Sequence, residues 1–238
     1  MLRMILTDFD GTLLSNGTNK LRDSFVTKIR RLTDCGMIFA VNSGRPYYSL
    51  RKELKALESR TVFICNDGAQ IMYKNCLLRK TVVDKEQACP VIELALKEGL
   101  TPFVALRERT LPITGEVLGN KGFFGEDIYK LVFVKNKTSA AGIQKIKELA
   151  KAVSLRVCYE DERYIELCHK DANKGSAAAY LKERFRIKDG VAAFGDGEND
   201  ISMFKEADLV YLIKNAKGIC YPGARAIENM QSFVVEEL

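Results

Sequence analysis

Two aspartates separated by one residue, Asp8 and Asp10, follow an apolar run in the segment RMILTDFDGTLL. Such a run, ended by acidic and glycine residues, is typical of a buried parallel strand leaving its sheet. Positions i and i+2 of an extended chain point the same way, so the two carboxylates are offered to one pocket. A divalent cation would relieve their repulsion, leaving one aspartate as a nucleophile and the other free to exchange a proton. Taken alone, the pattern fits a turn with helix-capping aspartates equally well.

A calcium-binding loop is a further reading of this segment, and the sequence excludes it. An EF-hand loop beginning at Asp8 needs glycine at its sixth position and glutamate at its twelfth. The chain has Leu13 and Asn19 there. Open α/β sheets place their ligand crevice at the carboxyl ends of the strands, which is where the aspartate pair falls.

Ser43 and Gly44 end the next expected strand, at residues 38–41. Because parallel neighbours end at the same edge of a sheet, the Ser43 hydroxyl and the backbone N–H groups could bind a phosphoryl oxygen beside Asp8. Judged by itself, this piece is better explained as a small-residue turn that leads into the helix after Pro46.

Lys174 lies in DANKG at 171–175, where a helix is expected to begin. A cation at a helix N-terminus opposes the helix dipole, so an anionic group is expected to compensate for it. The alternative is a lysine that faces solvent.

The segment GDGEND at 195–200 follows the apolar strand VAAF. It places Asp196 at the carboxyl end of a strand and Asp200 at the entry to the next helix. Asp196 is well placed to coordinate a metal shared with Asp8, and Asn199 could form a hydrogen bond with substrate or with Lys174. Helix capping is the alternative for these residues, and for Asp200 it is compatible with a role at the metal.

The elements that position these residues alternate at the start of the chain. One helix has Leu21, Phe25, Ile29 and Leu32 on one face and a stop signal at Gly36. With strands in RMILTDFDGTLL and at 38–41 and 62–65, and a helix after Pro46, the order is βαβαβ. This order predicts an α/β fold, a doubly wound Rossmann-like parallel sheet.

The regular alternation of strands and helices stops after about residue 70 and resumes at DANKG. We predict an α/β core from residues 1–70 and 169–238, and an inserted α+β cap domain at 71–168. The single histidine, His169, lies where the chain returns to the core, and a hinge or surface role is favoured over catalysis. Within the insertion we expect strands at 71–73, 77–83, 102–106, 130–134, 155–159 and 164–168 and helices at 86–98 and near 143–153. In the second part of the core we expect a helix to about 185, strands at 191–194 and 209–213, a short helix and a terminal FVV.

Composition narrows the class of protein. The 238 residues carry 37 Lys and Arg against 31 Asp and Glu, a net charge of +6 with the basic residues spread along the chain. The nearest basic cluster, KIRR at 28–31, is read as a solvated helix face, so no nucleic-acid partner is expected. No run of about 18 apolar residues exists, and no membrane partner is expected. Seven cysteines without C-x-x-C spacing are read as buried thiols in a reducing cytosol, which predicts a soluble cytoplasmic protein.

The four pieces together are more specific than any one of them. D-x-D-G-T, S-G-R, N-K-G and G-D-G-x-N-D occur in this order, each at a strand end or a helix start. The set resembles the four motifs of the haloacid dehalogenase superfamily of phosphotransferases. The long insertion between the second and third pieces is similar to the large cap of its Cof-type subgroup, subclass IIB, so the resemblance covers the whole chain.

The resemblance implies a role for each residue. Asp8 would be the nucleophile that forms an aspartyl-phosphate, and Asp10 the general acid and then base. Ser43 and Lys174 would hold the phosphate. Mg2+ would be held by Asp8, the Asp10 carbonyl and Asp196, with support from Asp200. One departure is NDGA at 66–69, where the subgroup usually has N-G-A: Asp67 stands in the asparagine position, which leaves the leaving-group specificity open.

Three functions follow as hypotheses. The leading one is a Mg2+-dependent phosphatase of a small phosphorylated metabolite, with a sugar phosphate as the expected substrate and the insertion as a closing lid. The second is a phosphomutase of the phosphomannomutase type, and the third is a non-catalytic regulator that binds a phosphometabolite. Substrate specificity is expected in the cap, through Arg107, Arg109 or Lys121. The oligomeric state is left open.

Overall fold

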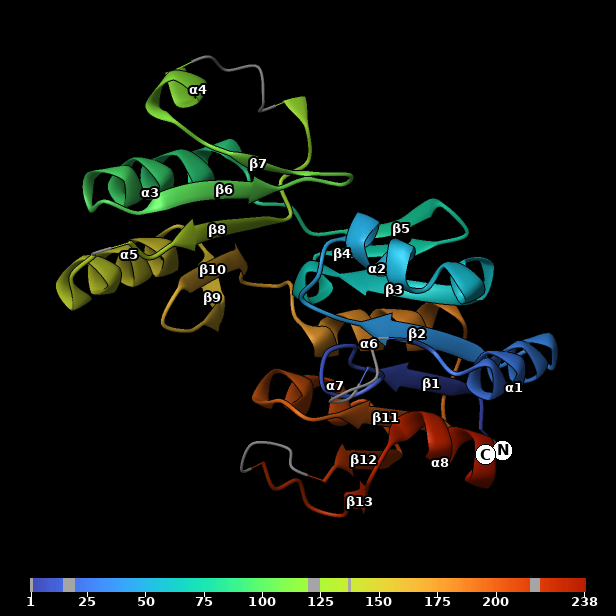
Figure 1. Cartoon of the computed structure of the whole chain (residues 1–238). Helices are drawn as coiled ribbons and strands as arrows, with labels where there is room; N and C mark the ends of the chain where they lie inside the picture. The colour runs from blue at the N-terminus through green and yellow to red at the C-terminus, as the bar shows by residue number, and fades with distance from the viewer. Residues whose placement is uncertain (1, 15–19, 120–124, 137, 215–218) are drawn as a thin grey trace. The chain divides into compact units, whose positions relative to one another are not determined.

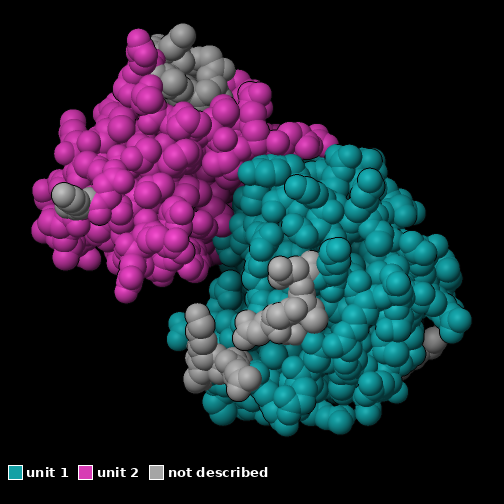
Figure 2. Space-filling view, viewed as in Figure 1, with its two compact units in different colours: residues 1–79, 173–238 teal, residues 80–172 magenta. Residues whose placement is uncertain are grey.

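The structure is a computed structural model that describes residues 2–14, 20–119, 125–136, 138–214 and 219–238. The chain forms two compact units (Figure 2). The core unit comprises residues 1–79 and 173–238, and the inserted unit comprises residues 80–172.

The core unit is built on an eight-stranded sheet with the order β13-β12-β11-β1-β2-β3-β4-β5 (Figure 1). Strand β1 pairs in parallel with β2 on one side and with β11 on the other. The residues that follow these three strands therefore meet at one edge of the sheet. The strands are β1 (Met4–Thr7), β2 (Ile38–Asn42), β3 (Thr61–Cys65), β4 (Gln70–Tyr73), β5 (Cys76–Lys80), β11 (Val191–Gly195), β12 (Leu209–Ile213) and β13 (Arg225–Ile227).

Helices cover both faces of this sheet. One hydrophobic cluster includes Phe25, Leu50 and Phe233, which come from three helices of one layer. The other includes Ala178 and Phe204, from two helices of the opposite layer. The first layer consists of α1 (Asp23–Asp34), α2 (Tyr47–Glu53) and α8 (Met230–Glu237), and the second of α6 (Lys174–Arg184) and α7 (Ile201–Phe204). The predicted α/β class and the doubly wound parallel sheet are confirmed.

The inserted unit has a five-stranded antiparallel sheet with the order β7-β6-β8-β10-β9. A hydrophobic cluster with Val91, Val104, Leu131 and Ile146 joins its helices to the sheet. The elements are α3 (Lys85–Lys97), β6 (Thr101–Ala105), β7 (Thr110–Pro112), α4 (Gly115–Gly119), β8 (Lys130–Val134), α5 (Ala140–Ala152), β9 (Leu155–Glu160) and β10 (Tyr164–His169). This is an α+β arrangement.

The boundaries of the two units differ from the predicted ones. Strands β4 and β5, expected at the start of the insertion, lie in the core sheet, since β4 pairs antiparallel with β3 with Ile64 opposite Ile71. The short turn at Asn66–Gly68 is the cause, because it returns the chain beside β3. The inserted unit accordingly runs from Lys80 to Ala172 rather than from 71 to 168.

The terminal FVV segment, Phe233–Val235, is helical and belongs to α8. The Asn229 side chain caps this helix by accepting a hydrogen bond from the Ser232 N–H. None of the described helices has the length and apolar composition needed to span a lipid bilayer. The seven cysteines, all in the described part of the chain, form no disulfide. The prediction that they are buried is correct for Cys65 and Cys168 but wrong for Cys35, Cys76 and Cys220, which are exposed.

Candidate active site

Asp8 lies directly after β1 and is 7% exposed. Its backbone N–H continues the parallel ladder by donating to the Phe194 carbonyl at 2.9 Å. The chain then turns sharply, and the Leu13 N–H donates back to the Asp8 carbonyl at 3.3 Å. The nucleophile predicted from the sequence is thus fixed at the carboxyl edge of the central strand.

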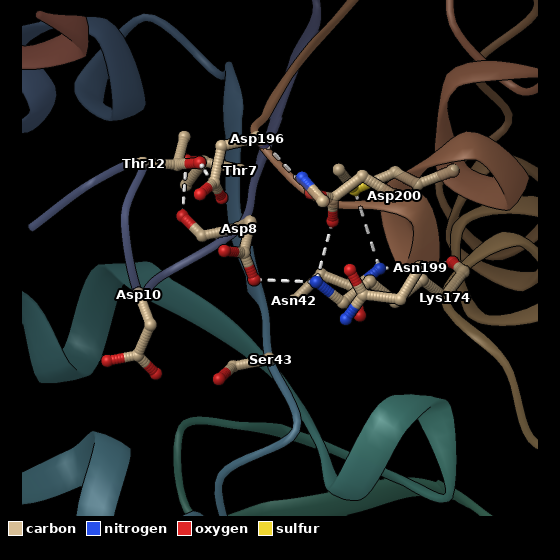
Figure 3. Close-up of polar contacts among 12 residues, drawn as sticks. Thr7, Asp8, Asp10, Thr12, Asn42, Ser43, Lys174, Asp196, Asn199 and Asp200 are labelled. Carbon is tan, nitrogen blue, oxygen red and sulfur yellow. Dashed lines mark hydrogen bonds and ion pairs between the residues drawn. The ribbon is translucent and has the colours of Figure 1, made fainter. Parts of the chain in front are cut away.

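Lys174 connects two of the predicted acidic residues (Figure 3). Its Nζ lies 2.6 Å from Asp8 Oδ1 and 2.6 Å from Asp200 Oδ1. The lysine begins α6, is 2% exposed, and its backbone carbonyl accepts a hydrogen bond from Asn42 Nδ2 at 3.0 Å. The anionic partners that a cation at a helix N-terminus requires are therefore the two aspartates.

Asp200 uses both carboxylate oxygens inside the protein. Oδ1 bonds to Lys174, and Oδ2 accepts the backbone N–H groups of Asp196 at 3.0 Å and Gly197 at 2.9 Å. A Cβ at Gly195 would lie 2.5 Å from Asp200 Oδ2, so only glycine fits there. Asp200 therefore shapes the loop that carries Asp196, and its oxygens are already occupied by these donors.

Asp196 follows β11, the neighbour of β1, and accepts a hydrogen bond from the Thr12 hydroxyl at 3.0 Å. Gly11 has a φ of +83°, and a Cβ added to it would lie 2.3 Å from Asp196 Oδ2. The DGT turn and the GDG loop thus approach each other closely, which requires glycine at position 11.

The acidic groups form a cluster suited to a hard cation. One carboxylate oxygen from each of Asp8, Asp196 and Asp200 lies within 4.8 Å of the others. Three carboxylates face a single ammonium group, which leaves excess negative charge in a largely buried place. Carboxylate oxygens are the ligands that Mg2+ prefers, so the residues present fit this ion.

The ionisation of the cluster reflects this crowding. Burial raises the pKa of Asp8 to about 8; Lys174 opposes the shift, whereas Asp200 and Asp196 add to it. Burial also raises the pKa of Asp196. For Lys174 burial acts in the opposite direction, but the carboxylates of Asp8 and Asp200 outweigh it and raise the pKa of the ammonium group. A bound cation would favour the ionised form of Asp8.

Asp10 has a different environment from Asp8. Its side chain is 56% exposed and bonds to Arg45 through two contacts, Nε to Oδ2 at 2.8 Å and Nη2 to Oδ1 at 2.6 Å. The Arg45 guanidinium also lies over the Phe9 ring, 4.9 Å from its centroid. This arrangement orients the Asp10 carboxylate while leaving it open to solvent and substrate.

Ser43 and Gly44 follow β2, the other neighbour of β1. Ser43 is 2% exposed, and its hydroxyl accepts the Arg45 N–H at 3.1 Å. Gly44 is half-buried, and a Cβ there would lie 3.2 Å from Asp67 Oδ2. Asp67 is buried and has a φ of +56°, so the residue that departs from the N-G-A pattern stands beside the SGR turn.

Asn199 is not buried as Asp8, Ser43, Lys174 and Asp200 are. It is exposed, and its carbonyl accepts a hydrogen bond from the Ser202 hydroxyl at 3.3 Å. The bonds of the Lys174 ammonium go to Asp8 and Asp200.

A family comparison agrees with this arrangement. The model of the haloacid dehalogenase-like hydrolases matches residues 5–122 and 117–227. The chain belongs to the haloacid dehalogenase-like hydrolases. The predicted membership is confirmed, and with it the prediction that the protein is an enzyme, a hydrolase.

Several named proteins align with nearly the whole length of this chain. The 5-amino-6-(5-phospho-D-ribitylamino)uracil phosphatase of Bacillus subtilis is 25% identical over 92% of this chain and 86% of its own. A phosphatase of the same superfamily from Bacteroides thetaiotaomicron has a similar structure, with a TM-score of 0.80 at 22% identity, covering 98% of this chain and 92% of its own. A third protein, a subclass IIB sugar phosphatase, has a TM-score of 0.72 at 16% identity over 97% of this chain and 94% of its own. These two structural likenesses establish the fold.

Sequence reasoning assigned no role to three residues of the site: Thr12, Asn42 and Arg45. Thr12 and Arg45 stand inside the DGT and SGR motifs, so their position in a motif was an available signal. Asn42 is a buried polar residue at the end of an apolar strand, which is a weaker signal.

The residues expected to set specificity lie in the inserted unit. Arg107 is paired with Glu108 at 3.4 Å, and Arg109 is paired with Glu126. Lys121 is outside the described residues. His169 ends β10, and its Nδ1 accepts the Asp171 N–H at 3.3 Å.

Proposed function

We propose that the protein is a Mg2+-dependent phosphatase that hydrolyses a small phosphorylated metabolite through an aspartyl-phosphate on Asp8. The observation that carries the proposal is the buried contact of Asp8 with Lys174 at the end of β1, beside Asp196. A carboxylate held next to an ammonium group and a cation site is arranged to attack an anionic phosphoryl group, because the positive charges offset the repulsion between the two anions.

The reaction has two steps. In the first, a carboxylate oxygen of Asp8 bonds to phosphorus, the bond to the leaving oxygen breaks, and Asp10 gives that oxygen its proton. In the second, water attacks phosphorus, Asp10 takes a proton from the water, and the bond from phosphorus to Asp8 breaks. Inorganic phosphate leaves, and both aspartates return to their starting forms.

The phosphoryl oxygens need donors and positive charge. Lys174 supplies an ammonium group, Ser43 supplies a hydroxyl and Gly44 supplies a backbone N–H after the neighbouring strand. We assign a further contact to Asn199, whose exposed side chain can reach substrate. Each donor stabilises negative charge on the group being transferred.

Asp8, Asp196 and the Asp10 carbonyl would hold Mg2+. When bound, the ion neutralises charge on the phosphoryl group and on Asp8. Asp200 supports the site indirectly, because its oxygens already fix Lys174 and the backbone of Asp196.

A sugar phosphate is the substrate class we favour. Of the named relatives, one acts on a phosphorylated ribityl compound and another is a sugar phosphatase. We propose that the inserted unit is the cap that selects the substrate, with Arg107 and Arg109 as candidate contacts. Both arginines are ion-paired at partly exposed positions, so they can exchange partners at small cost.

The test is a panel of phosphorylated metabolites assayed for phosphate release with Mg2+. We expect release from at least one sugar phosphate by the wild type and none by Asp8→Asn. Isomerisation of the ester without phosphate release would identify a phosphomutase instead. Binding of the same metabolites without any turnover would identify a regulator and overturn the proposal.

A further inference from the structure

The side chain of Gln231, in the C-terminal helix α8, is buried and forms hydrogen bonds through both its amide nitrogen and its amide oxygen. It is 1% exposed. Its Nε2 donates to the Leu13 carbonyl at 2.9 Å, and its Oε1 accepts the Arg22 N–H at 2.8 Å. Both bonds join α8 to the first segment of the chain, across sequence separations of 218 and 209 residues.

The first of these bonds reaches the turn that carries Asp10. Within that turn the Leu13 N–H donates to the Asp8 carbonyl, and the Leu14 N–H donates to the Phe9 carbonyl at 2.9 Å. Leu13 is therefore held on one side by Asp8 and on the other by Gln231. Asp10 lies between the two fixed ends of the turn.

Two more contacts from the first turn of α8 reach the same region. The Thr7 hydroxyl, which donates to the Asp8 carbonyl at 2.7 Å, also lies 3.0 Å from the Met230 sulfur. Arg22 bonds through Nη1 to the Ser232 hydroxyl at 2.7 Å. The start of α8 thus contacts the chain before Asp8 and after Leu13.

We propose that Gln231 is a positioning residue for Asp10, and this inference rests on the proposed function. A buried amide whose donor and acceptor are both matched specifies one geometry, because any rotation leaves two polar groups unpaired. An error of about 1 Å in the placement of a reacting group can reduce the rate by on the order of 100-fold. Loss of the Leu13 bond should therefore impair proton transfer by Asp10 more than attack by Asp8.

The experiment compares two esters of similar shape, phenyl phosphate and p-nitrophenyl phosphate. Phenolate is the more basic leaving group and depends more on a general acid. We measure kcat/KM for both esters in the wild type, Gln231→Met and Gln231→Glu, each assayed well below its melting temperature. Ser232→Ala is the matched control, since it removes a neighbouring contact of α8 with Arg22 but leaves the Leu13 bond in place.

We expect Gln231→Met to lose about 10-fold or more in kcat/KM for phenyl phosphate and clearly less for p-nitrophenyl phosphate. Ser232→Ala should behave as the wild type with both esters. Gln231→Glu can donate to the Leu13 carbonyl only when protonated. Its activity with phenyl phosphate, relative to the wild type, should therefore rise as the pH is lowered.

Equal losses with the two esters, or no loss, would overturn the role of Gln231. If Gln231→Met does not fold, the test is the activity of Gln231→Glu with phenyl phosphate divided by that of the wild type. A value of this ratio that does not change with pH would also overturn the role of Gln231. A wild type that releases phosphate from neither ester would instead contradict the proposed function, so the two failures are distinguishable.

Discussion

The Nζ atom of Lys174 lies 2.6 Å from Oδ1 of Asp8, and the side chains are only 1% and 10% exposed. The same Nζ lies 2.6 Å from Asp200 Oδ1. Removing both charges of a buried pair can be nearly neutral, but removing one partner leaves an uncompensated charge in a largely buried place. The site is therefore sensitive to loss of the lysine in two ways, through stability and through chemistry.

Lys174→Met should lower the free energy of unfolding by about 3 to 5 kcal/mol, because the fully buried carboxylate of Asp200 loses its cation. Urea unfolding of the metal-free protein measures this change. Lys145→Met is the control, since Lys145 pairs with Glu98 while 59% exposed, and its loss should cost less than about 1 kcal/mol. Equal effects of the two substitutions would show that the buried contact does not stabilise the protein.

The contribution of Asp8 to the stability of the metal-free protein should fall as the pH rises from about 4 to 8. Burial raises the pKa of Asp8 from its ordinary value of 3.8 to about 8, so between these values the folded state holds a proton that the unfolded chain has released. The stability contributed by this proton is complete below pH 4 and is lost as the pH approaches 8, at up to about 1.4 kcal/mol per pH unit. Unfolding curves recorded at several pH values with EDTA present measure this change in the free energy of unfolding.

Asp8→Asn provides the comparison for this pH dependence, because an amide does not titrate. The variant should lose less stability than the wild type between pH 5 and 8. Parallel curves for the two proteins would mean that Asp8 ionises normally in the folded state.

The fold could be predicted from hydrophobic patterning because the central strands are continuous apolar runs. Met4–Thr7 and Val191–Gly195 are buried at every position, as parallel strands between helices require. The limits of the insertion could not be predicted in the same way. They depend on the turn at Asn66–Gly68, where two non-glycine residues, Asn66 and Asp67, adopt positive φ.

The candidate site shows a similar division. Asp8, Asp196 and Lys174 could be located because each stands at the end of a predicted element. Two contacts that support the site could not be predicted, those of Arg45 with Asp10 and of Gln231 with Leu13. Both depend on how distant segments of the chain pack together. Side-chain patterning carries no information about such contacts between separate elements.

Activity should be lost on chelation with EDTA, restored by Mg2+ and inhibited by Ca2+. Mg2+ requires compact octahedral coordination, whereas Ca2+ prefers more numerous and longer bonds that would engage both oxygens of Asp8. Asp196→Asn should raise the Mg2+ concentration needed for half-maximal activity, because it removes one of the proposed anionic ligands. Full phosphate release in EDTA would contradict the metal requirement.

Replacement of residues 80–172 by a short Gly/Ser linker should leave a folded core, because β1 to β4, β5 without its last residue, and β11 to β13 are kept with both hydrophobic clusters. Turnover of the natural metabolite should fall, while some hydrolysis of acetyl phosphate remains. Replacement of 71–168 is the control: it removes most of β4 and all of β5 from the sheet and should prevent folding. A folded core from the first replacement that bound Mg2+ but hydrolysed nothing would contradict the proposed division between cap and core.

The central claim is that the phosphoryl group passes through Asp8. The most direct measurement is acid quenching during turnover of p-nitrophenyl phosphate, followed by borohydride reduction and trypsin digestion. Trypsin releases residues 4–20 as one peptide that contains Asp8 and Asp10. We predict that reduction converts Asp8 to homoserine in this peptide from the wild type, with no such conversion in Asp8→Asn. Sustained turnover by the wild type with position 8 unmodified, or with modification at Asp10 instead, would contradict it.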